Sequence, residues 1–257
     1  MRRAVLIAAA LAAAAAAPTA EAKRAPKSQA EQAKPDPAAR AEIAKQDPLA
    51  QMAFWAQENA RFPDDAEAAV AFADALRRGG RAPRAVEVAQ VALERHPRDF
   101  ELTRALGYAL VAAGRGGEAI APLSSVASVA QDDWATRVTL GVALEQAGRG
   151  AEARVTFEQA RKMAPQEPTI LTNLGLSYLM AGDAGAAEKL LREAAALPGA
   201  TAQTRQNLAV ALGVQGRFAE AERLARVDLP PEAVADNMAY LRALLSDGRR
   251  WGDLRPQ

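Results

Sequence analysis

The sequence predicts an all-α protein, an α-solenoid in which helical hairpins stack on one another and a C-terminal helix caps the stack. Three observations support this prediction. About a quarter of the 257 residues are alanine and only 5% are aromatic, a composition that favours closely packed helices over sheets. Glycine and apolar residues recur every 34 positions between residues 72 and 221. A proline pair after the last repeat then begins one further amphipathic segment.

The N-terminal segment, residues 1–22, has the layout of a secretory signal peptide. A basic start at Arg2 and Arg3 precedes an apolar run at residues 4–17, and the small residues up to Ala22 fit a cleavage site. The apolar run is shorter than the ~20 residues that a membrane-spanning helix needs. We therefore expect cleavage after Ala22 and a mature protein in a bacterial periplasm.

A period of 34 residues organises the body of the chain. Five columns of residues keep this spacing through five copies without a gap, so an internal repeat is indicated. The columns are Phe72, Leu106, Leu140, Leu174 and Leu208; Ala73, Gly107, Gly141, Gly175 and Ala209; Leu76, Leu110, Leu144, Tyr178 and Leu212; Gly80, Gly114, Gly148, Gly182 and Gly216; and Ala85, Ala119, Ala153, Ala187 and Ala221.

Each column has a physical role in a helical hairpin. Leu140, Gly141 and Leu144 share one face of a first helix. Because glycine costs a helix ~0.5–1 kcal/mol relative to alanine, Gly141 indicates close approach of the neighbouring helix. Gly148 is expected to end the first helix in a left-handed conformation. Ala153 then opens the apolar face of the second helix, and each hairpin buries its faces against its neighbours.

These spacings resemble the tetratricopeptide repeat (TPR) family, which implies a right-handed superhelix. The resemblance divides the chain as follows: five TPR units at 66–99, 100–133, 134–167, 168–201 and 202–229, preceded by an N-terminal partial repeat helix at 48–63. Residues 23–47 lack apolar periodicity and are rich in Lys, Ala and Pro, which predicts a flexible linker. Residues 230–257 are expected to form a capping helix and a tail. The capping face consists of Val234, Met238, Leu241 and Leu245.

Resemblance to the TPR family implies that the first helices line a concave groove that holds a peptide or a helix of a partner protein. Register places the following residues in that partner-binding groove: Tyr108, Val111, Val138, Val142, Asn173, Leu176, Leu179, Met180, Asn207, Val210 and Val214. The alternative is that the apolar members pack within the superhelix and bind nothing. The carboxylate clamp of chaperone-tail TPR domains is not expected, because Val70, Asp74 and Thr172 stand at matching positions. Arg104 and Arg137 are interpreted as solvated edge residues.

Composition disfavours an enzyme, which stays open only as an alternative. The 32 basic and 31 acidic residues nearly balance, so no charge pattern indicates nucleic acid or an anionic membrane as a partner. The chain has no cysteine and one histidine; His96, in a turn before Pro97, is interpreted as a surface residue. We therefore expect no catalytic residues, no cofactor-binding residues and no metal site. The aspartate pairs at 64–65 and 132–133 are expected to cap helices.

A narrower resemblance concerns the C-terminal part. The residues that carry it are similar to TadD-type proteins of the tight-adherence (Flp) pilus apparatus. They are Gln206-Asn207-Leu208-Ala209, the stretch from Gly216 to Glu222, the stretch from Asp228 to Glu232, Asn237-Met238-Ala239-Tyr240-Leu241-Arg242, and the segment from Asp47 to Ala56. This resemblance implies a periplasmic assembly factor at the outer membrane that supports the pilus secretin or other Flp-pilus components. Many such proteins are lipoproteins, whereas no cysteine is present here, so a direct lipid anchor through cysteine is not expected. The alternative is a generic periplasmic TPR adaptor in envelope biogenesis or polysaccharide export.

Overall fold

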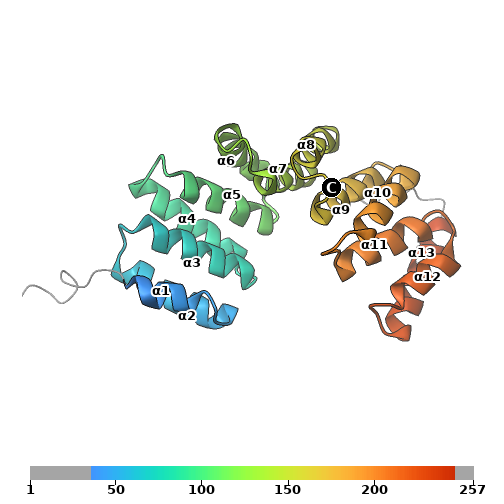
Figure 1. Cartoon of the computed structure of the whole chain (residues 1–257), viewed down its shortest axis with the longest axis horizontal. Helices are drawn as coiled ribbons and strands as arrows, with labels where there is room; N and C mark the ends of the chain where they lie inside the picture. Colours follow the sequence, from blue (N-terminus) through green and yellow to red (C-terminus); the bar gives the residue numbers. More distant parts are fainter. Residues whose placement is uncertain (1–35, 247–257) are drawn as a thin grey trace, which may run out of the picture. The chain divides into compact units, whose positions relative to one another are not determined.

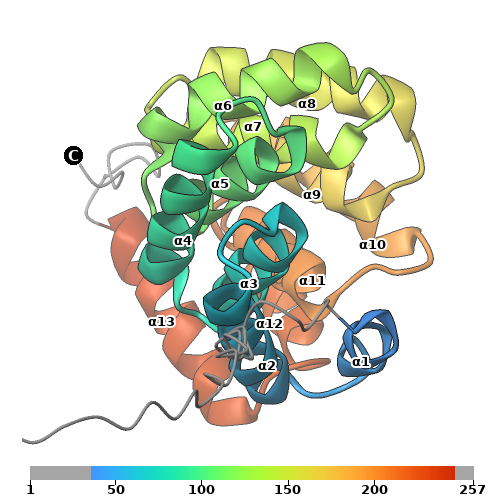
Figure 2. The same ribbon diagram turned by 90° about the vertical axis from the view of Figure 1, so that its left-hand side faces the viewer.

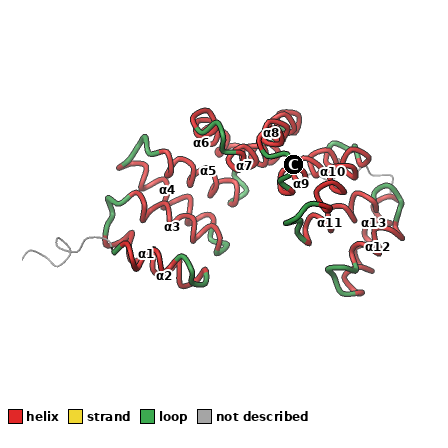
Figure 3. Tube along the Cα trace, in the orientation of Figure 1, coloured by secondary structure: helices red, strands yellow, loops and turns green. Residues whose placement is uncertain are grey.

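The structure, a computed structural model, describes residues 36–246. The predicted signal peptide, the first part of the predicted linker and the predicted C-terminal tail lie outside these residues. Within the described range all regular secondary structure is helical, and short loops join the helices (Figure 3). The all-α prediction is therefore confirmed.

Five hairpins follow two N-terminal helices and precede a final one. The helices of the described range are α1 Pro37–Ile43, α2 Pro48–Arg61, α3 Ala66–Arg78, α4 Ala82–Arg95, α5 Phe100–Ala112, α6 Gly116–Val129, α7 Trp134–Gln146, α8 Gly150–Met163, α9 Pro168–Met180, α10 Ala184–Ala196, α11 Ala202–Gly213, α12 Phe218–Ala225 and α13 Pro231–Ser246. Each of the five predicted units contains one hairpin, from α3–α4 to α11–α12.

Side-chain caps and left-handed glycines set the ends of the first helices. Asp65, Asp99 and Asp133 each accept a hydrogen bond from the backbone N–H three residues later, which satisfies an N–H group that the helix itself leaves free. The glycines at the predicted turn positions have positive φ values, such as 75° at Gly148, a conformation that glycine adopts without a steric penalty. The predictions for helix caps and turns are confirmed.

Close packing within each hairpin explains the glycines inside the first helices. A Cβ atom on Gly141 would lie 2.7 Å from Cδ1 of Phe157 in α8, and one on Gly175 would lie 2.9 Å from Cγ of Leu191 in α10. Real Cβ atoms do not approach other atoms so closely. The predicted close approach of the second helix is therefore confirmed, and the partner is one large side chain in each hairpin.

The first helices form a continuous inner layer. Contacts join α3 to α5, α5 to α7, α7 to α9 and α9 to α11, besides the contacts within each hairpin. Figure 1 shows consecutive helices side by side along the stack. Figure 2 shows the first helices of the middle hairpins toward the centre of the view and the second helices α4, α6, α8 and α10 outside them. The inner layer is the face on which the sequence predicts a groove.

Helix α13 caps the last hairpin. Val234, Met238 and Leu241 are buried in one cluster with residues of α11 and α12, and a Cβ on Gly213 would lie 2.5 Å from Cδ1 of Leu241. The capping prediction holds for these three residues. It is wrong for Leu245, which is 37% exposed, because this residue lies one helical turn beyond Leu241, the last residue of α13 in the buried cluster.

The predicted linker is wrong at its C-terminal end, because residues 37–43 form helix α1. Asp36 caps this helix, and Arg40 fixes it to the repeats. The guanidinium of Arg40 lies 2.9 Å from Glu58 and 2.6 Å from Asp65, its side chain is 8% exposed, and it lies 5.4 Å from the ring centroid of Trp55. Besides Arg40, Ile43 packs against the cluster around Trp55. One apolar contact and one charged anchor give no apolar period in the sequence, so the pattern does not predict this helix.

Candidate partner-binding groove

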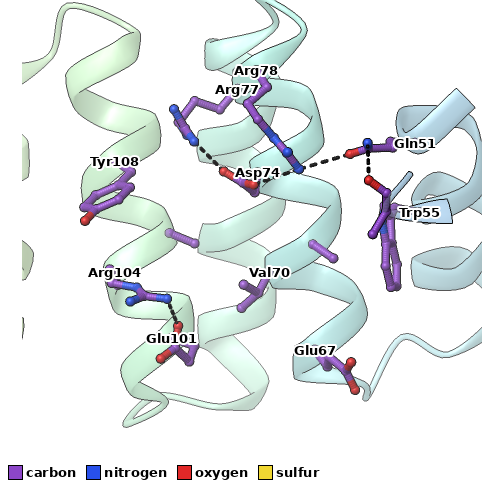
Figure 4. A pocket seen from close by; sticks show the side chains of 13 residues that line it. Gln51, Trp55, Glu67, Val70, Asp74, Arg77, Arg78, Glu101, Arg104 and Tyr108 are labelled. Atoms are coloured by element: carbon purple, nitrogen blue, oxygen red, sulfur yellow. Dashed lines mark hydrogen bonds and ion pairs between the residues drawn. The ribbon is translucent and has the colours of Figure 1, made fainter. Parts of the chain in front are cut away.

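The inner layer carries a cavity of about 400 Å³ between α2, α3 and α5 (Figure 4). We call it the α3–α5 cavity. Its lining combines apolar side chains with three arginines and three carboxylates. The lining residues are Ala44, Gln51, Trp55, Glu67, Val70, Ala71, Asp74, Arg77, Arg78, Glu101, Arg104, Ala105 and Tyr108. Pockets of 300–1,000 Å³ lined by apolar groups and a few placed polar groups are typical binding sites.

Tyr108 forms part of the apolar lining on the α5 side of the cavity (Figure 4). Its ring is half-buried, and the side chains of Val70 and Ala105 line the same space. The hydroxyl of Tyr108 lies 3.1 Å from Oγ1 of Thr136 on α7, and the guanidinium carbon of Arg77 lies 5.9 Å from the ring centroid, within the range of a cation–π contact. These contacts hold the ring in place while its remaining face borders the cavity.

One end of the cavity carries two arginines that share one carboxylate. Nη2 of Arg77 lies 2.5 Å from Oδ1 of Asp74, and Nη2 of Arg78 lies 2.9 Å from Oδ2. Arg78 also donates to Oε1 of Gln51 at 3.1 Å. Figure 4 shows this arginine end at the C-terminal turn of α3. Two guanidinium groups against one carboxylate leave one excess positive charge.

The opposite end carries two glutamates at the first turns of α3 and α5. Glu101 pairs with Arg104, which also lies 3.8 Å from Asp133. Glu67 lies 3.2 Å from the buried Arg40, but its own side chain is 75% exposed. Among the residues that line this glutamate end, two carboxylates face one guanidinium, so one negative charge is in excess.

The ion pairs of Arg40 connect helix α1 to this glutamate end. Burial alone would raise the pKa of Asp65, but the hydrogen bond from Arg40 and the one from the backbone of Ala68 outweigh burial, so the pKa of Asp65 lies below its ordinary value. The carboxylate therefore stays ionised at neutral pH. Because Ala44 follows α1 and lines the cavity, the position of α1 determines one wall of the site.

The predicted groove residues differ in where the structure places them. Tyr108 lines the α3–α5 cavity. Val111, Val142, Leu176 and Met180 are half-buried on α5, α7 and α9.

Two members of the prediction are core residues. Val138 is 7% exposed and Leu179 is 3% exposed, each within a cluster of buried residues. A first helix packs against its own second helix and also against the next hairpin, so only part of its apolar surface reaches the inner face. The structure therefore corrects the expectation that Val138 and Leu179 lie on the groove surface.

The C-terminal members of the prediction lie beside the capping helix. Asn207 and Val210 line a second cavity, of about 250 Å³, together with Met238 and Tyr240 of α13. Val214 packs against the same cluster as the cap. At this end of the inner layer the chain's own helix borders the predicted groove.

The two asparagines already use part of their hydrogen-bonding capacity within their own helices. Nδ2 of Asn173 donates to the carbonyl of Thr169 at 2.8 Å, and Oδ1 of Asn207 accepts from Gln203 at 3.0 Å. Each amide keeps further donor or acceptor capacity. The structure does not bring the two asparagines into one cavity, since Asn207 belongs to the cavity beside α13.

Sequence reasoning missed most of the α3–α5 cavity, although the repeat carries a signal for it. Asp74 stands one period before Tyr108, and Arg104 stands one period before Val138. The prediction from register omits both positions, because Arg104 is interpreted as a solvated edge residue and Asp74 is noted only as unable to form a carboxylate clamp. Arg137 also differs from the expectation, since it donates to the carbonyls of Ala127 and Ala130, each at 3.2 Å.

Residues 36–246 hold neither a cluster suited to a metal ion nor a helix suited to crossing a membrane. No group of three or more His, Asp or Glu side chains there is arranged to hold a metal ion. None of the described helices has both the length and the apolar character needed to cross a membrane. His96 ends α4 and is half-buried, with its Nε2 atom enclosed and unbonded, so it is less exposed than the sequence suggests.

Solved structures match this chain at low sequence identity. A thermophilic TPR protein of Thermus thermophilus is 21% identical with a TM-score of 0.58, and the match covers 69% of this chain and 99% of that one. MamA from Desulfovibrio magneticus RS-1 is 19% identical with a TM-score of 0.54, covering 61% and 89%. MamA of strain MSR-1 is 23% identical with a TM-score of 0.51, covering 61% and 88%. These likenesses show the fold alone.

Comparison with protein families gives matches along the repeats. A tetratricopeptide repeat profile matches residues 48–100, 70–133 and 138–201, and a second tetratricopeptide repeat profile matches residues 201–229. No curated protein matches the chain. The matched ranges span more than half of the sequence and coincide with the hairpins of the structure. The chain therefore belongs to the tetratricopeptide repeat family.

Proposed function

We propose that this protein is a non-enzymatic periplasmic scaffold that supports assembly of the Flp (tight-adherence) pilus apparatus, through the outer-membrane secretin. Membership of the TPR family suggests a protein–protein interaction scaffold. The observation that carries partner binding is the α3–α5 cavity, an open space of about 400 Å³ on the inner helix layer. The resemblance of residues 206–242 to TadD-type proteins supports the assignment to the pilus.

The proposal requires export of the chain. The basic, apolar and small-residue pattern of residues 1–22 supports a periplasmic location. Without a cysteine to acylate, a protein partner must hold the chain at the outer membrane. Edman sequencing of the protein purified from its own cells is expected to begin at Lys23, and an intact Met1 in a cytosolic fraction would contradict the location.

Affinity capture tests the partner. The mature protein, tagged at its C-terminus, is captured from crosslinked envelopes of pilus-producing cells and its companions are identified by mass spectrometry. Enrichment of the secretin is expected, and a Tyr108→Glu variant is expected to lose it because a charge would enter the apolar part of the cavity. A matched Val155→Glu variant places the same charge at an exposed apolar residue of α8 that lines neither cavity and is expected to retain it.

The same experiment separates the two candidate functions. Capture of other envelope or polysaccharide-export machinery, with the pilus proteins present in the cells but absent from the eluate, would contradict the pilus role. It would favour a generic periplasmic adaptor with the same fold.

A further inference from the structure

We propose that the α3–α5 cavity binds an internal, extended segment of its partner in which an acidic and a basic side chain stand about five residues apart and flank an apolar centre. This inference rests on the proposed partner-binding function, and it adds the chemistry of the segment that is recognised. Four features of the cavity carry it: its apolar floor, its two charged ends, their separation and the pairing at the arginine end.

The floor of the cavity suits apolar side chains. Val70, Ala105 and the ring of Tyr108 line it (Figure 4), and none of these brings a charged group to its centre. An apolar cavity of ~150 Å³ already accepts a benzene-sized group. A cavity of about 400 Å³ therefore has room for two neighbouring apolar side chains and the backbone between them.

The two ends of the cavity carry opposite charge. Arg77 and Arg78 share Asp74 at the arginine end, which leaves one positive charge in excess. At the glutamate end, Glu67 and Glu101 line the cavity with Arg104, which leaves one negative charge in excess. A segment with one carboxylate and one ammonium group complements both ends, whereas a segment with two like charges is repelled at one of them.

The separation of the ends sets the spacing in the partner. Arg77 follows Glu67 by ten positions on α3, which is about 15 Å along a helix axis. An extended chain rises ~3.3 Å per residue, so about five residues of partner span the same distance. The required pattern is therefore an acidic and a basic residue at positions i and i+5, in either chain direction, with apolar residues between them.

The pairing at the arginine end favours an internal segment over a chain terminus or a phosphate. Asp74 already accepts from both guanidinium groups, and Arg78 also donates to Gln51, so the end offers one excess charge rather than a clamp. Phosphates of a nucleic acid would also meet Glu67 and Glu101 at the other end. A single side-chain carboxylate of the partner therefore matches the one excess positive charge at the arginine end.

A peptide titration tests the inference. The probe is an acetylated and amidated hexapeptide with aspartate first, lysine last, and leucine and phenylalanine at its centre. Two comparison peptides carry aspartate at both ends or lysine at both ends. Titrations of the ¹⁵N-labelled mature protein, followed by NMR, are expected to give roughly tenfold tighter binding of the mixed peptide than of either comparison peptide, since two exposed charge pairs each contribute modestly. The shifts should centre on the amides of Ala105 and Tyr108.

Charge-reversal variants test the assignment of the two ends. Arg77→Glu with Arg78→Glu makes both ends acidic, so the preference is expected to move to the lysine-ended peptide. Glu67→Lys with Glu101→Lys makes both ends basic and is expected to favour the aspartate-ended peptide. Arg84→Glu with Arg95→Glu changes the charge equally on α4, outside the cavity, and is expected to keep the preference for the mixed peptide. Circular dichroism checks that each variant folds. If one of the two cavity variants unfolds, the peptide preference of the other is enough to test the assignment of the ends.

Two outcomes overturn the inference. One is equal binding of the three peptides, or preference of the unaltered protein for a like-charged peptide. The other is a preference that stays unchanged in a folded cavity variant. Secretin capture without any charge preference would keep the proposed function and overturn this inference. A charge preference without secretin capture would overturn the pilus role and leave the inference standing.

Discussion

Gly107, Gly141 and Gly175 occupy the same place in three successive hairpins, and each faces one large buried side chain of the second helix. The partners are Leu123, Phe157 and Leu191. Because Phe157 is only 1% exposed, its ring has no room to move away from an added methyl group. Close packing of the two helices at these positions therefore depends on a glycine in the first helix and a large side chain in the second.

At this scale we predict that Gly141→Ala destabilises the protein by about 1–2 kcal/mol. Overpacking of a core costs ~1–3 kcal/mol, and the better helix propensity of alanine returns ~0.5–1 kcal/mol. Chemical denaturation followed by circular dichroism measures the change. The matched control is Gly117→Ala in the first turn of α6, where an added Cβ meets no atom within 4 Å; its stability should be unchanged or slightly raised. Equal stability of the two variants would contradict the close contact.

Among the elements, α1 is held by the ion pairs of Arg40 and by Ile43, which packs against the cluster around Trp55. Arg40→Met keeps a long apolar stem but removes the hydrogen bonds to Glu58, Asp65 and Glu67. We predict that the amides of residues 38–44 then exchange with deuterium much faster, while those of α5 keep their protection. The control is Arg84→Met, which removes an exposed pair with Glu87. Unchanged exchange in α1 would show that Arg40 does not hold the helix.

The contact between α10 and the start of α12, which Glu188 makes with Arg217, is predicted to stabilise the fold in a pH-dependent way. Burial opposes ionisation of Glu188, but hydrogen bonds from Arg192, Arg217 and Gln215 outweigh it and lower its pKa to about 2. Since the pKa is lower in the folded than in the unfolded state, the stabilisation is present above pH ~4.5 and is lost as the pH falls toward the folded value.

The measurement compares the unaltered protein with Glu188→Gln. The midpoint denaturant concentration is measured for both proteins at pH 6, 4 and 3. At pH 6 the unaltered protein is expected to have the higher midpoint, and the difference between the two midpoints is expected to shrink at each lower pH. A difference in midpoint that stays constant would contradict the role of the Glu188 carboxylate in the contact between α10 and α12.

The elements also show what the sequence can and cannot predict. The period of 34 locates α3 to α12 because each buries small and apolar residues at fixed positions. Helix α1 is not predicted from the sequence, because its anchor, Arg40, bonds to residues 18 to 27 positions away. No local sequence pattern contains such contacts. The same limit applies to the candidate site. Tyr108 is predictable from register, whereas the sequence marks Asp74 only as a position that cannot form a carboxylate clamp. Its pairing with Arg77 and Arg78 becomes visible only in the structure.

For the whole molecule, we predict that the cap formed by α13 contributes to solubility as well as to stability. Met238→Asp would place an unpaired charge among the buried residues of the last cluster, where Met238 is 3% exposed, and is expected to cost about 3 kcal/mol. An uncovered apolar end also favours association between copies, because solenoids need polar outer faces at their ends.

Sedimentation velocity and thermal denaturation check this prediction. Ala239→Asp, at the neighbouring exposed position of α13, adds the same charge outside the cluster and should leave both measurements unchanged. A monomeric Met238→Asp variant with an unaltered melting curve would contradict the role of α13 as a cap.

Trp55 gives the molecule an optical reporter of its own. Its indole is 8% exposed, lies under the Arg40 guanidinium and lines the α3–α5 cavity, and the chain has only two other tryptophans, Trp134 and Trp251. With those two replaced by phenylalanine, all indole emission comes from the place where α1 and the cavity meet. Release of α1 would shift that emission to the red, and occupation of the cavity would change its intensity, so both events become visible without any added label.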